Sequence, residues 1–245
     1  MRSLSFFLDI LYPPRCVACG AAKREEGARG WWCTECRDAV EVTPRDPCPR
    51  CLSVEATHDR AACEGALPFY GVVATGFYHS LPLRRLVADV KYQGVTATAV
   101  SVEAYARTFK ERRNGVLPWA QEEALAVVPM PLATSRERQR GFNQAAWVAE
   151  RLCAAWDIHD ALPHGTAASL LLRRKTTSTQ AELGHDERMR QANIRGAFQA
   201  TRPVTTPVLL VDDVITTGAT AAEAARALQA VGSPRIYLAA LALGK

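Results

Sequence analysis

The sequence contains no long apolar run. No stretch approaches about 18 consecutive uncharged apolar residues, the length that a membrane-spanning helix needs. The short apolar run at the N-terminus is interrupted by Asp9 and is not followed by a small-residue cleavage site, which argues against a signal peptide. Internal repeats and low-complexity segments are missing as well. We therefore expect a cytoplasmic protein with no membrane span.

Charge of one sign is not in large excess. The formal net charge of the 245 residues is +5 and the isoelectric point is near 8.8, which is mildly basic and compatible with phosphate-rich ligands. Many proteins without a nucleic-acid partner carry such a charge, so it does not by itself indicate one. Apolar residues make up 48% of the chain and charged residues 22%, as expected for a globular protein with a hydrophobic core.

Cysteine is almost absent after residue 63. Seven of the eight cysteines lie between Cys16 and Cys63, and the eighth, Cys153, is placed for packing on a predicted helix. In a reducing compartment, clustered cysteine pairs are typical of metal sites rather than of disulfides. No Ser/His/Asp or Cys/His arrangement indicates nucleophilic catalysis, and no general base can be assigned.

The first four cysteines have the spacing of a zinc site. Cys16 and Cys19 form one CxxC pair, Cys33 and Cys36 form another, and 13 residues separate the pairs. Each pair can bring two thiolates to one tetrahedral ion. A segment with so few core residues would hardly fold without a metal, although unbound thiols are the alternative. We predict structural zinc at these four cysteines.

A second set of ligands is less complete. Cys48 and Cys51 form a third CxxC pair, which only Cys63 and His58 can extend. His58 is either the fourth ligand of a Cys₃His site or an exposed loop residue. The spacing is also compatible with a cross-braced arrangement, in which alternate pairs share one ion. A second zinc ion therefore stays an open alternative.

The composition changes near residue 67. Residues 1–66 are rich in Cys, Pro and Arg and form a predicted zinc-binding module. Residues 67–245 alternate strand and helix patterns, which predicts an α/β domain with a parallel sheet and flanking helices. We expect strands at 71–78, 124–128, 169–172, 207–211 and 235–243, and helices at 81–91, 97–113, 143–156 and 220–231.

Residues 208–220, VLLVDDVITTGAT, predict a phosphate site. A continuous apolar strand belongs in a parallel sheet that is covered on both faces, where ligands bind beyond the carboxyl ends of the strands. The small, hydroxylated residues that follow open a helix, whose N-terminal backbone N–H groups attract anions. Gly218 would let the chain approach the phosphate closely. The expected loop consists of Thr216, Thr217, Gly218, Ala219 and Thr220.

Two carboxylates precede this loop. Asp212 and Asp213 would repel a phosphate, so we expect them to face neutral donors or a cation, such as ribose hydroxyls and Mg²⁺. A loop that binds an anion, a few residues from two carboxylates that bind a diol, together predict a pocket for a ribose 5-phosphate. A solvated strand end followed by a threonine cap is the alternative.

Basic residues follow two other predicted strands. Arginine suits phosphate oxygens because its guanidinium donates two parallel hydrogen bonds. A mobile loop after the 169–172 strand could close over a charged ligand, and solvated connections are the alternative. The candidates for contacts with a pyrophosphate or another charged group are Met130, Pro131, Arg138, Arg140, Arg173 and Lys175.

Residues 208–220 resemble the signature motif of type I phosphoribosyltransferases. Together with Lys91-Tyr92, Pro129-Met-Pro131, Arg140-Gly-Phe-Asn-Gln144 and the segment from Lys175 to Asn193, nearly the whole chain resembles the ComF family, which includes competence and GntX-like proteins. The resemblance implies a zinc module fused to a phosphoribosyltransferase domain that binds 5-phosphoribosyl 1-pyrophosphate (PRPP) with Mg²⁺. It places the acidic pair on the ribose hydroxyls and the Thr-Gly loop on the 5-phosphate.

The same resemblance implies roles in natural transformation, with single-stranded DNA and competence proteins as partners. The ComF pattern often has a fourth cysteine pair, whereas Ala66 stands three residues after Cys63 here. Two functions stay open. The chain is either a transferase that moves phosphoribosyl from PRPP to an acceptor, or a non-catalytic module for nucleotide sensing or single-stranded DNA.

Overall fold

A computed structural model describes residues 15–22, 32–92, 96–114, 116–133, 137–138, 140–160, 170–174 and 194–244. Helices and strands alternate along most of the chain after the cysteine-rich segment. In chain order they are α2 (Thr34–Asp38), β1 (Gly71–Phe77), α3 (Leu81–Tyr92), α4 (Thr96–Arg112), β2 (Ala126–Pro129), α6 (Gln144–Trp156), β3 (Leu171–Arg173), β4 (Phe198–Ala200), β5 (Val208–Ile215), α9 (Ala219–Gln229) and β6 (Ile236–Leu243). No helix of these described ranges is long and apolar enough to cross a membrane.

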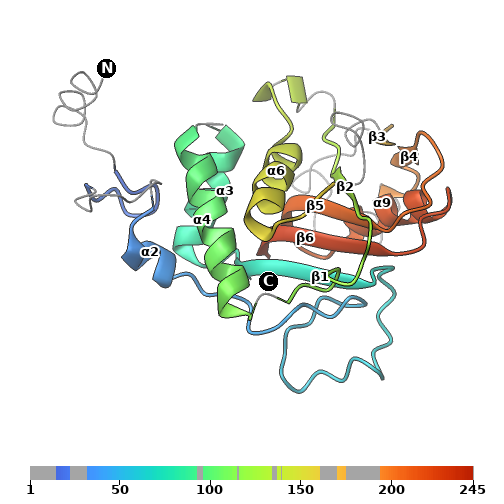
Figure 1. Ribbon diagram of the computed structural model, residues 1–245, viewed down its shortest axis with the longest axis horizontal. Coiled ribbons are helices and arrows are strands. Elements are labelled where there is room, and N and C mark those ends of the chain that lie inside the picture. The colour runs from blue at the N-terminus through green and yellow to red at the C-terminus, as the bar shows by residue number, and fades with distance from the viewer. Residues whose placement is uncertain are drawn as a thin grey trace.

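The main sheet has four parallel strands in the order β1-β6-β5-β2 (Figure 1). β6 pairs with β1 on one side and with β5 on the other, and every residue of β6 is buried. Fully apolar strands of this kind belong inside a sheet whose two faces are both covered. The predicted α/β class, with a parallel sheet, flanking helices and a preceding cysteine-rich module, is confirmed.

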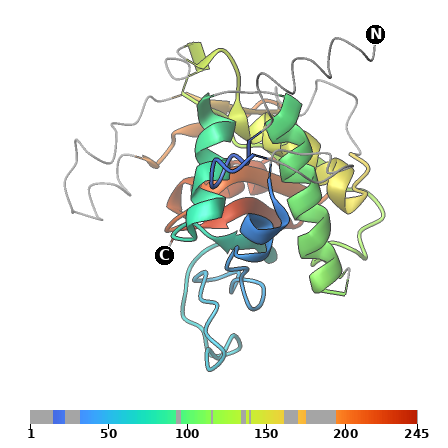
Figure 2. The same cartoon turned by 90° about the vertical axis from the view of Figure 1, so that its left-hand side faces the viewer.

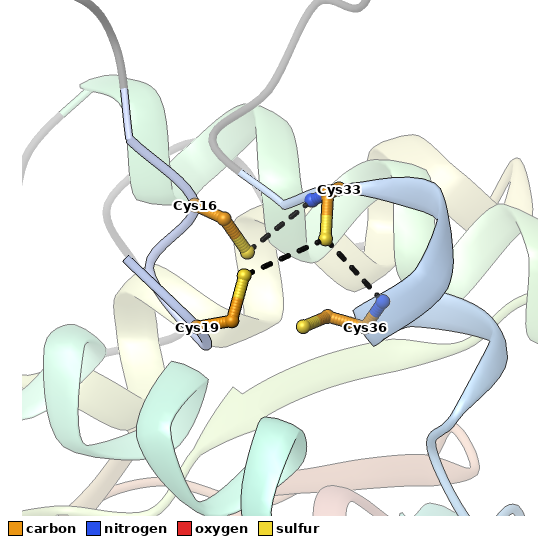
Figure 3. Close-up of side chains that lie close together, drawn as sticks. All are labelled: Cys16, Cys19, Cys33 and Cys36. Atoms are coloured by element: carbon orange, nitrogen blue, oxygen red, sulfur yellow. Dashed lines mark hydrogen bonds between the residues drawn. The ribbon is translucent and has the colours of Figure 1, made fainter. Parts of the chain in front are cut away.

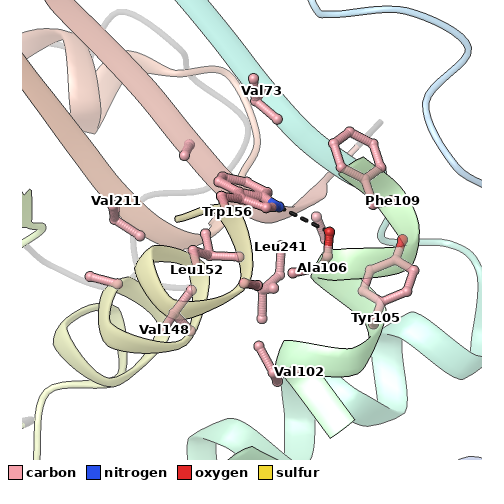
Figure 4. Close-up of a cluster of buried hydrophobic side chains, with 14 of the residues drawn as sticks. Val73, Val102, Tyr105, Ala106, Phe109, Val148, Leu152, Trp156, Val211 and Leu241 are labelled. Atoms are coloured by element: carbon pink, nitrogen blue, oxygen red, sulfur yellow. Dashed lines mark hydrogen bonds between the residues drawn. The ribbon is translucent and has the colours of Figure 1, made fainter. Parts of the chain in front are cut away.

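Helices α3, α4 and α6 cover one face of the sheet, and Figure 2 looks onto α3 and α4 in front of the strands. Figure 4 shows Phe109 of α4 and Leu152 and Trp156 of α6 among the buried side chains beneath this layer. The indole Nε1 of Trp156 donates a hydrogen bond to the Ala106 carbonyl at 2.9 Å, which satisfies a polar group inside the core. This bond ties α6 to α4.

The opposite face is covered by α9 and by a short antiparallel ribbon of β3 and β4. α9 places a stripe of small residues, including Ala221, Ala224 and Ala225, against the sheet. Small side chains let a helix lie close to the strands beneath it. The N-terminus of α9 is therefore held near the carboxyl edge of β5, which is where a ligand site is expected.

The cysteine-rich segment contacts both faces of the sheet. Its first part joins the core under α4, where the rings of Trp32 and Tyr105 lie 5.1 Å apart. It then runs along β1, where the Thr43 hydroxyl donates to the Ala74 carbonyl at 2.6 Å. Its second part contributes Leu52 to the core under α9. The segment therefore passes around the β1 edge of the sheet and shares both hydrophobic cores.

Three features differ from the sequence prediction. β5 does not end at Val211 but continues to Ile215, because its second half pairs with β6 up to Leu243. Asp212 and Asp213 therefore lie within the strand rather than beyond it. β4 and α2 were not predicted, since three and five residues are too few to show a period. The strand expected at 169–172 is β3, shifted by a residue or two, and residue 169 itself lies outside the described part.

Glu122 connects the loop before β2 to the start of β6. Its carboxylate accepts hydrogen bonds from Nε and a terminal nitrogen of Arg235, at 2.7 and 2.6 Å, and from the Tyr237 hydroxyl. The bonds from Arg235 hold the pKa of Glu122 below its ordinary value of 4.5, against the opposing effect of burial. The folded state therefore favours the ionised carboxylate more strongly than the unfolded state does.

We predict that Glu122→Gln lowers the free energy of unfolding at pH 7 by about 1–2 kcal/mol, since Arg235 is partly solvated. A lowered folded pKa stabilises the fold above the unfolded value, and this contribution is lost as the pH falls through the folded pKa. The difference between wild type and variant, measured by urea unfolding, should therefore shrink below about pH 4. Metal loss in acid affects both proteins and cancels. A difference that does not depend on pH would contradict this assignment.

Candidate functional site

The acidic pair lies where β5 extends past its neighbour. β2 ends at Pro129, opposite Val211, so the next two residues of β5 have β6 on one side and no partner from β2 on the other. Asp212 and Asp213 are both partly buried there. The strand thus presents two carboxylates at the carboxyl edge of the sheet, the edge at which open parallel sheets bind ligands.

Lys91, the penultimate residue of α3, pairs with this acidic site. Its Nζ lies 3.1 Å from Oδ2 of Asp213, and both side chains are largely buried. Burial and the charge of Asp213 raise the pKa of Asp212 well above its ordinary value, while Lys91 acts in the opposite direction. Two adjacent carboxylates with one cation form a site that can take up a further positive charge. The sequence analysis gave Lys91 no role here, although Lys91-Tyr92 was part of the family resemblance.

The loop after β5 enters α9 through Gly218. This glycine is the N-cap of the helix with φ +75°, and no side chain caps the helix start. Within the loop, the Ala219 amide donates to Oγ1 of Thr217 at 3.4 Å, and Thr216 and Thr217 are exposed. A helix of 11 residues whose N-cap is a glycine without a side chain, and whose first residues Ala219 and Thr220 are partly exposed, can offer backbone N–H groups and the positive end of its dipole to an anion. The loop thus leads directly into a helix, as the sequence predicted, and its binding of an anion stays a prediction.

Gly218 has a second steric role that the sequence did not indicate. A Cβ atom at this position would lie 3.1 Å from Cδ1 of Leu52 and 3.1 Å from Cδ1 of Leu67. Both leucines precede β1, Leu52 within the cysteine-rich segment and Leu67 directly after it, and both are far from Gly218 in the sequence. A side chain at residue 218 would therefore meet this segment, and it would also be strained by the positive φ.

The segment after β2 lies directly beside the acidic pair. The Met130 amide donates to the Val211 carbonyl at 2.8 Å, and Met130 is buried while Pro131 is partly exposed. Asn143 then caps α6 and donates from Nδ2 to the Met130 carbonyl at 3.1 Å. These contacts place the start of α6 and the Met130-Pro131 turn next to Asp212.

The expected basic residues differ in their exposure and in the elements to which they belong. Arg138 is exposed and Arg140 is partly exposed, as expected for a connection before α6. Arg173 belongs to β3 rather than to the loop expected after it, which corrects the prediction for that residue. Arg173 ends β3 with its guanidinium 5.6 Å from the centre of the Phe198 ring, and Arg174 binds Gln199 of β4. Lys175 and the residues that follow it, up to 193, lie outside the described residues.

The first four cysteines converge on one point, as Figure 3 shows. Their sulfur atoms all lie within 4.8 Å of one another, and the Sγ atoms of Cys19 and Cys33 are 3.8 Å apart. A tetrahedral zinc site with Zn–S bonds of about 2.3 Å separates its sulfurs by about 3.8 Å. The amide of Cys36 also donates to Sγ of Cys33 at 3.4 Å, a bond that stabilises a thiolate.

Four further ligands form a second group. Cys48, Cys51, Cys63 and His58 also have their ligand atoms within 4.8 Å of one another, and Nε2 of His58 is 3.4 Å from Sγ of Cys51. Burial disfavours the Cys48 thiolate, but backbone N–H groups and His58 lower its pKa to about 6 overall. The groups consist of consecutive pairs rather than alternate ones, so the cross-braced alternative does not apply. Each donor set fits one zinc ion.

Comparison with known proteins agrees with this arrangement. A family model described as a double zinc ribbon domain matches residues 7–67. The chain is 29% identical over 224 residues to the DNA utilization protein YhgH of Escherichia coli, covering 86% of this chain and 90% of the relative. It is 27% identical over 206 residues to the competence protein ComFC of Bacillus subtilis, covering 80% and 77%. The chain is a homologue of these ComF-type proteins.

A third relative, the competence protein F of Haemophilus influenzae, is 29% identical over 219 residues, covering 86% of this chain and 84% of the relative. The predicted resemblance to the ComF family is thus confirmed over most of the chain. The double zinc ribbon and the two ligand groups together support structural zinc in this ComF homologue.

We predict two zinc ions per chain by elemental analysis of the purified protein. Cys16→Ser should remove one ion and Cys48→Ser the other, because each substitution leaves the opposite group complete. Proteolysis should then cut within the damaged half first, since each half depends on its own ion for folding. A wild-type protein that holds a single ion, unaffected by Cys48→Ser, would contradict the second site.

Proposed function

We propose that this ComF homologue binds PRPP with Mg²⁺ and acts in DNA utilization, as the names of its relatives indicate for them. The observation that carries the proposal is the order of features along one strand, loop and helix. Partly buried Asp212 and Asp213 are followed within a few residues by the uncapped start of α9 at Gly218. One end of this unit suits a cation or hydroxyl groups, and the other end suits an anion.

The two ends match the two ends of a phosphorylated ribose. The 5-phosphate would accept hydrogen bonds from the backbone amides of loop 216–220 and from the hydroxyls of Thr216 and Thr217. The ribose hydroxyls would donate hydrogen bonds to Asp212 and Asp213. These carboxylates would repel a phosphate, because both groups are negatively charged. Mg²⁺ would offset the charge of both the carboxylates and the ligand when it is bound. We assign the Met130-Pro131 turn, which follows the strand beside Val211, and Arg140 as the neighbours of a bound pyrophosphate.

A transferase function would follow from this binding mode. Pyrophosphate would leave from C1 of the ribose, and its developing charge would be balanced by cations positioned in advance. We infer that Lys91 contributes to this balance. Lys91 pairs with Asp213 in the free protein, and it would be released to attract the pyrophosphate when the ribose binds to Asp213. The acceptor would enter opposite the leaving group. No described side chain is assigned as the base for that acceptor.

A non-catalytic role in handling single-stranded DNA is the second candidate. It is favoured by the name of the YhgH relative, a DNA utilization protein, and by Arg173 and Arg174 at the β3-β4 ribbon. Their positive charge suits the phosphates of a single strand, whereas the Phe198 ring is buried and would not stack on bases. The parallel sheet itself does not distinguish the two candidates, because fold alone does not determine function.

We predict that Asp213→Asn weakens PRPP binding by about tenfold to 150-fold in calorimetric titrations with millimolar Mg²⁺. The substitution keeps the size of the side chain but removes its charge, and a hydrogen bond to a charged group contributes about 1.5–3 kcal/mol. Ribose 5-phosphate should compete with PRPP, whereas free ribose should not, because the anion site dominates recognition.

Lys91→Met is the matched comparison, since it removes the opposite charge of the same ion pair. It should tighten Mg²⁺ binding in the absence of PRPP, because the carboxylates lose a competing cation. Far-UV circular dichroism has to stay unchanged in both variants. Absence of PRPP binding by the wild type would overturn the proposed function. PRPP binding without pyrophosphate release with any nucleobase or amine acceptor would favour the non-catalytic candidate.

For the second candidate we predict a steep salt dependence of binding to single-stranded DNA. If Arg138, Arg140, Arg173 and Arg174 contact phosphates, each contact should add about 0.7 to the slope of log affinity against log salt. Arg138→Ala with Arg140→Ala should flatten the slope by about two such contributions, as measured by fluorescence anisotropy. Binding that does not change with salt would count against a DNA surface made by these arginines.

A further inference from the structure

Leu52 follows the Cys48–Cys51 pair in a constrained conformation. Its φ is +63°, which is rare for a residue with a side chain, and only 1% of the residue is exposed. Its amide donates to the Cys48 carbonyl at 2.8 Å, and the Cys48 amide donates to the Ser53 carbonyl at 2.8 Å. The turn that brings Cys48 and Cys51 together thus also determines where Leu52 points. Such a left-handed conformation persists only where surrounding contacts fix it.

Leu67 is attached to the same turn. Its amide donates to the Arg50 carbonyl at 3.1 Å, and Nε of Arg50 donates to the Gly65 carbonyl at 3.0 Å. Gly65 fits so closely that a Cβ there would lie 2.2 Å from the Arg50 oxygen. The segment after Cys63 is therefore held against the Cys48–Cys51 turn, so the position of Leu67 depends on the position of that turn.

Both leucines contact the predicted anion loop. The space beside Gly218 is filled by Leu52 and Leu67, each with a methyl carbon 3.1 Å from the position of a Cβ. Leu52 belongs to the same buried cluster as Ile215, before the loop, and Ala221 and Ala222, after it. The first cysteine group belongs to the other cluster, under α4. Leu52 and Leu67 thus link the turn of the second ligand group, rather than the first group, to Gly218.

We propose that Leu52 and Leu67 are positioning residues for the anion loop, and that the second ligand group is a structural support of that loop. Anion affinity at the start of α9 then depends on an intact group of Cys48, Cys51, His58 and Cys63. It does not depend in this way on the first group. The ligand part of this inference rests on the proposed function, whereas the positioning part concerns the free protein.

Two backbone hydrogen bonds report on the loop without any ligand. The Ala222 amide donates to the Gly218 carbonyl at 2.8 Å, so its exchange with solvent measures how firmly Gly218 is held. The Gly244 amide donates to the Ile215 carbonyl at 2.7 Å and reports on the start of the same loop. Amides in the centre of β6 serve as internal references for global unfolding.

The test compares hydrogen exchange by NMR in three variants. Leu52→Ala should accelerate exchange at Ala222 about tenfold relative to the β6 amides, whereas Leu52→Met should restore the wild-type ratio, because it keeps most of the volume. Leu86→Ala, which opens a buried site under the opposite face, is the matched control and should leave that ratio unchanged. An unchanged ratio in Leu52→Ala, or an equal increase in Leu86→Ala, would overturn the proposal.

Titration with ribose 5-phosphate separates this inference from the proposed function. Leu52→Ala and Cys48→Ser should each weaken binding about tenfold, whereas Cys16→Ser should retain wild-type affinity. Wild-type affinity in Leu52→Ala would overturn the positioning role and leave the proposed function standing. Absence of binding in the wild type, with the expected exchange at Ala222, would overturn the proposed function and support the positioning role.

Discussion

The unequal length of neighbouring strands shapes the candidate site. β5 lies between β6 and β2, and hydrophobic burial on both faces fixes its first half. β6 supports it as far as Ile215, but β2 stops opposite Val211. The backbone of Asp212 and Asp213 is therefore held by one neighbour while their other side stays open. A pair of carboxylates this close together is electrostatically costly, and the apolar strand that precedes it provides the stability that keeps it in place.

Local sequence patterns predicted most of the fold. The helices α3, α4, α6 and α9 each have at least 11 residues, enough for a 3.6-residue period to show. The end of β5 could not be predicted in the same way. Two aspartates after an apolar run look like the end of a strand, and only the register with β6, set by distant residues, extends it. The short β4 forms for the same reason, because it pairs with β3 across a long connection.

Some residues of the candidate site could be predicted from contiguous motifs, whereas others reach it from distant parts of the sequence. Residues 212–220 and the CxxC pairs are each contiguous in sequence, so their chemistry was visible as a motif. Lys91 reaches Asp213 from the end of α3, and Leu52 reaches Gly218 from the cysteine-rich segment. A single sequence does not reveal such contacts, since nothing local in it distinguishes Lys91 or Leu52 from other lysines and leucines. The sequence singled out Gly218 because a glycine would let the chain approach a phosphate closely. It did not indicate that Leu52 and Leu67 also fill the space beside this residue.

The two ligand groups pack on opposite faces of the sheet. The first shares a core with α3 and α4, and α3 carries Lys91 to the acidic pair. The second shares a core with α9, whose start is the proposed anion loop. A ribbon with few apolar residues cannot bury enough surface to fold alone, so each half gains stability from its ion and from the sheet face beneath it. Metal binding and the geometry of the site are then linked, because a contact that orders the ribbon also orders the α/β residue it touches.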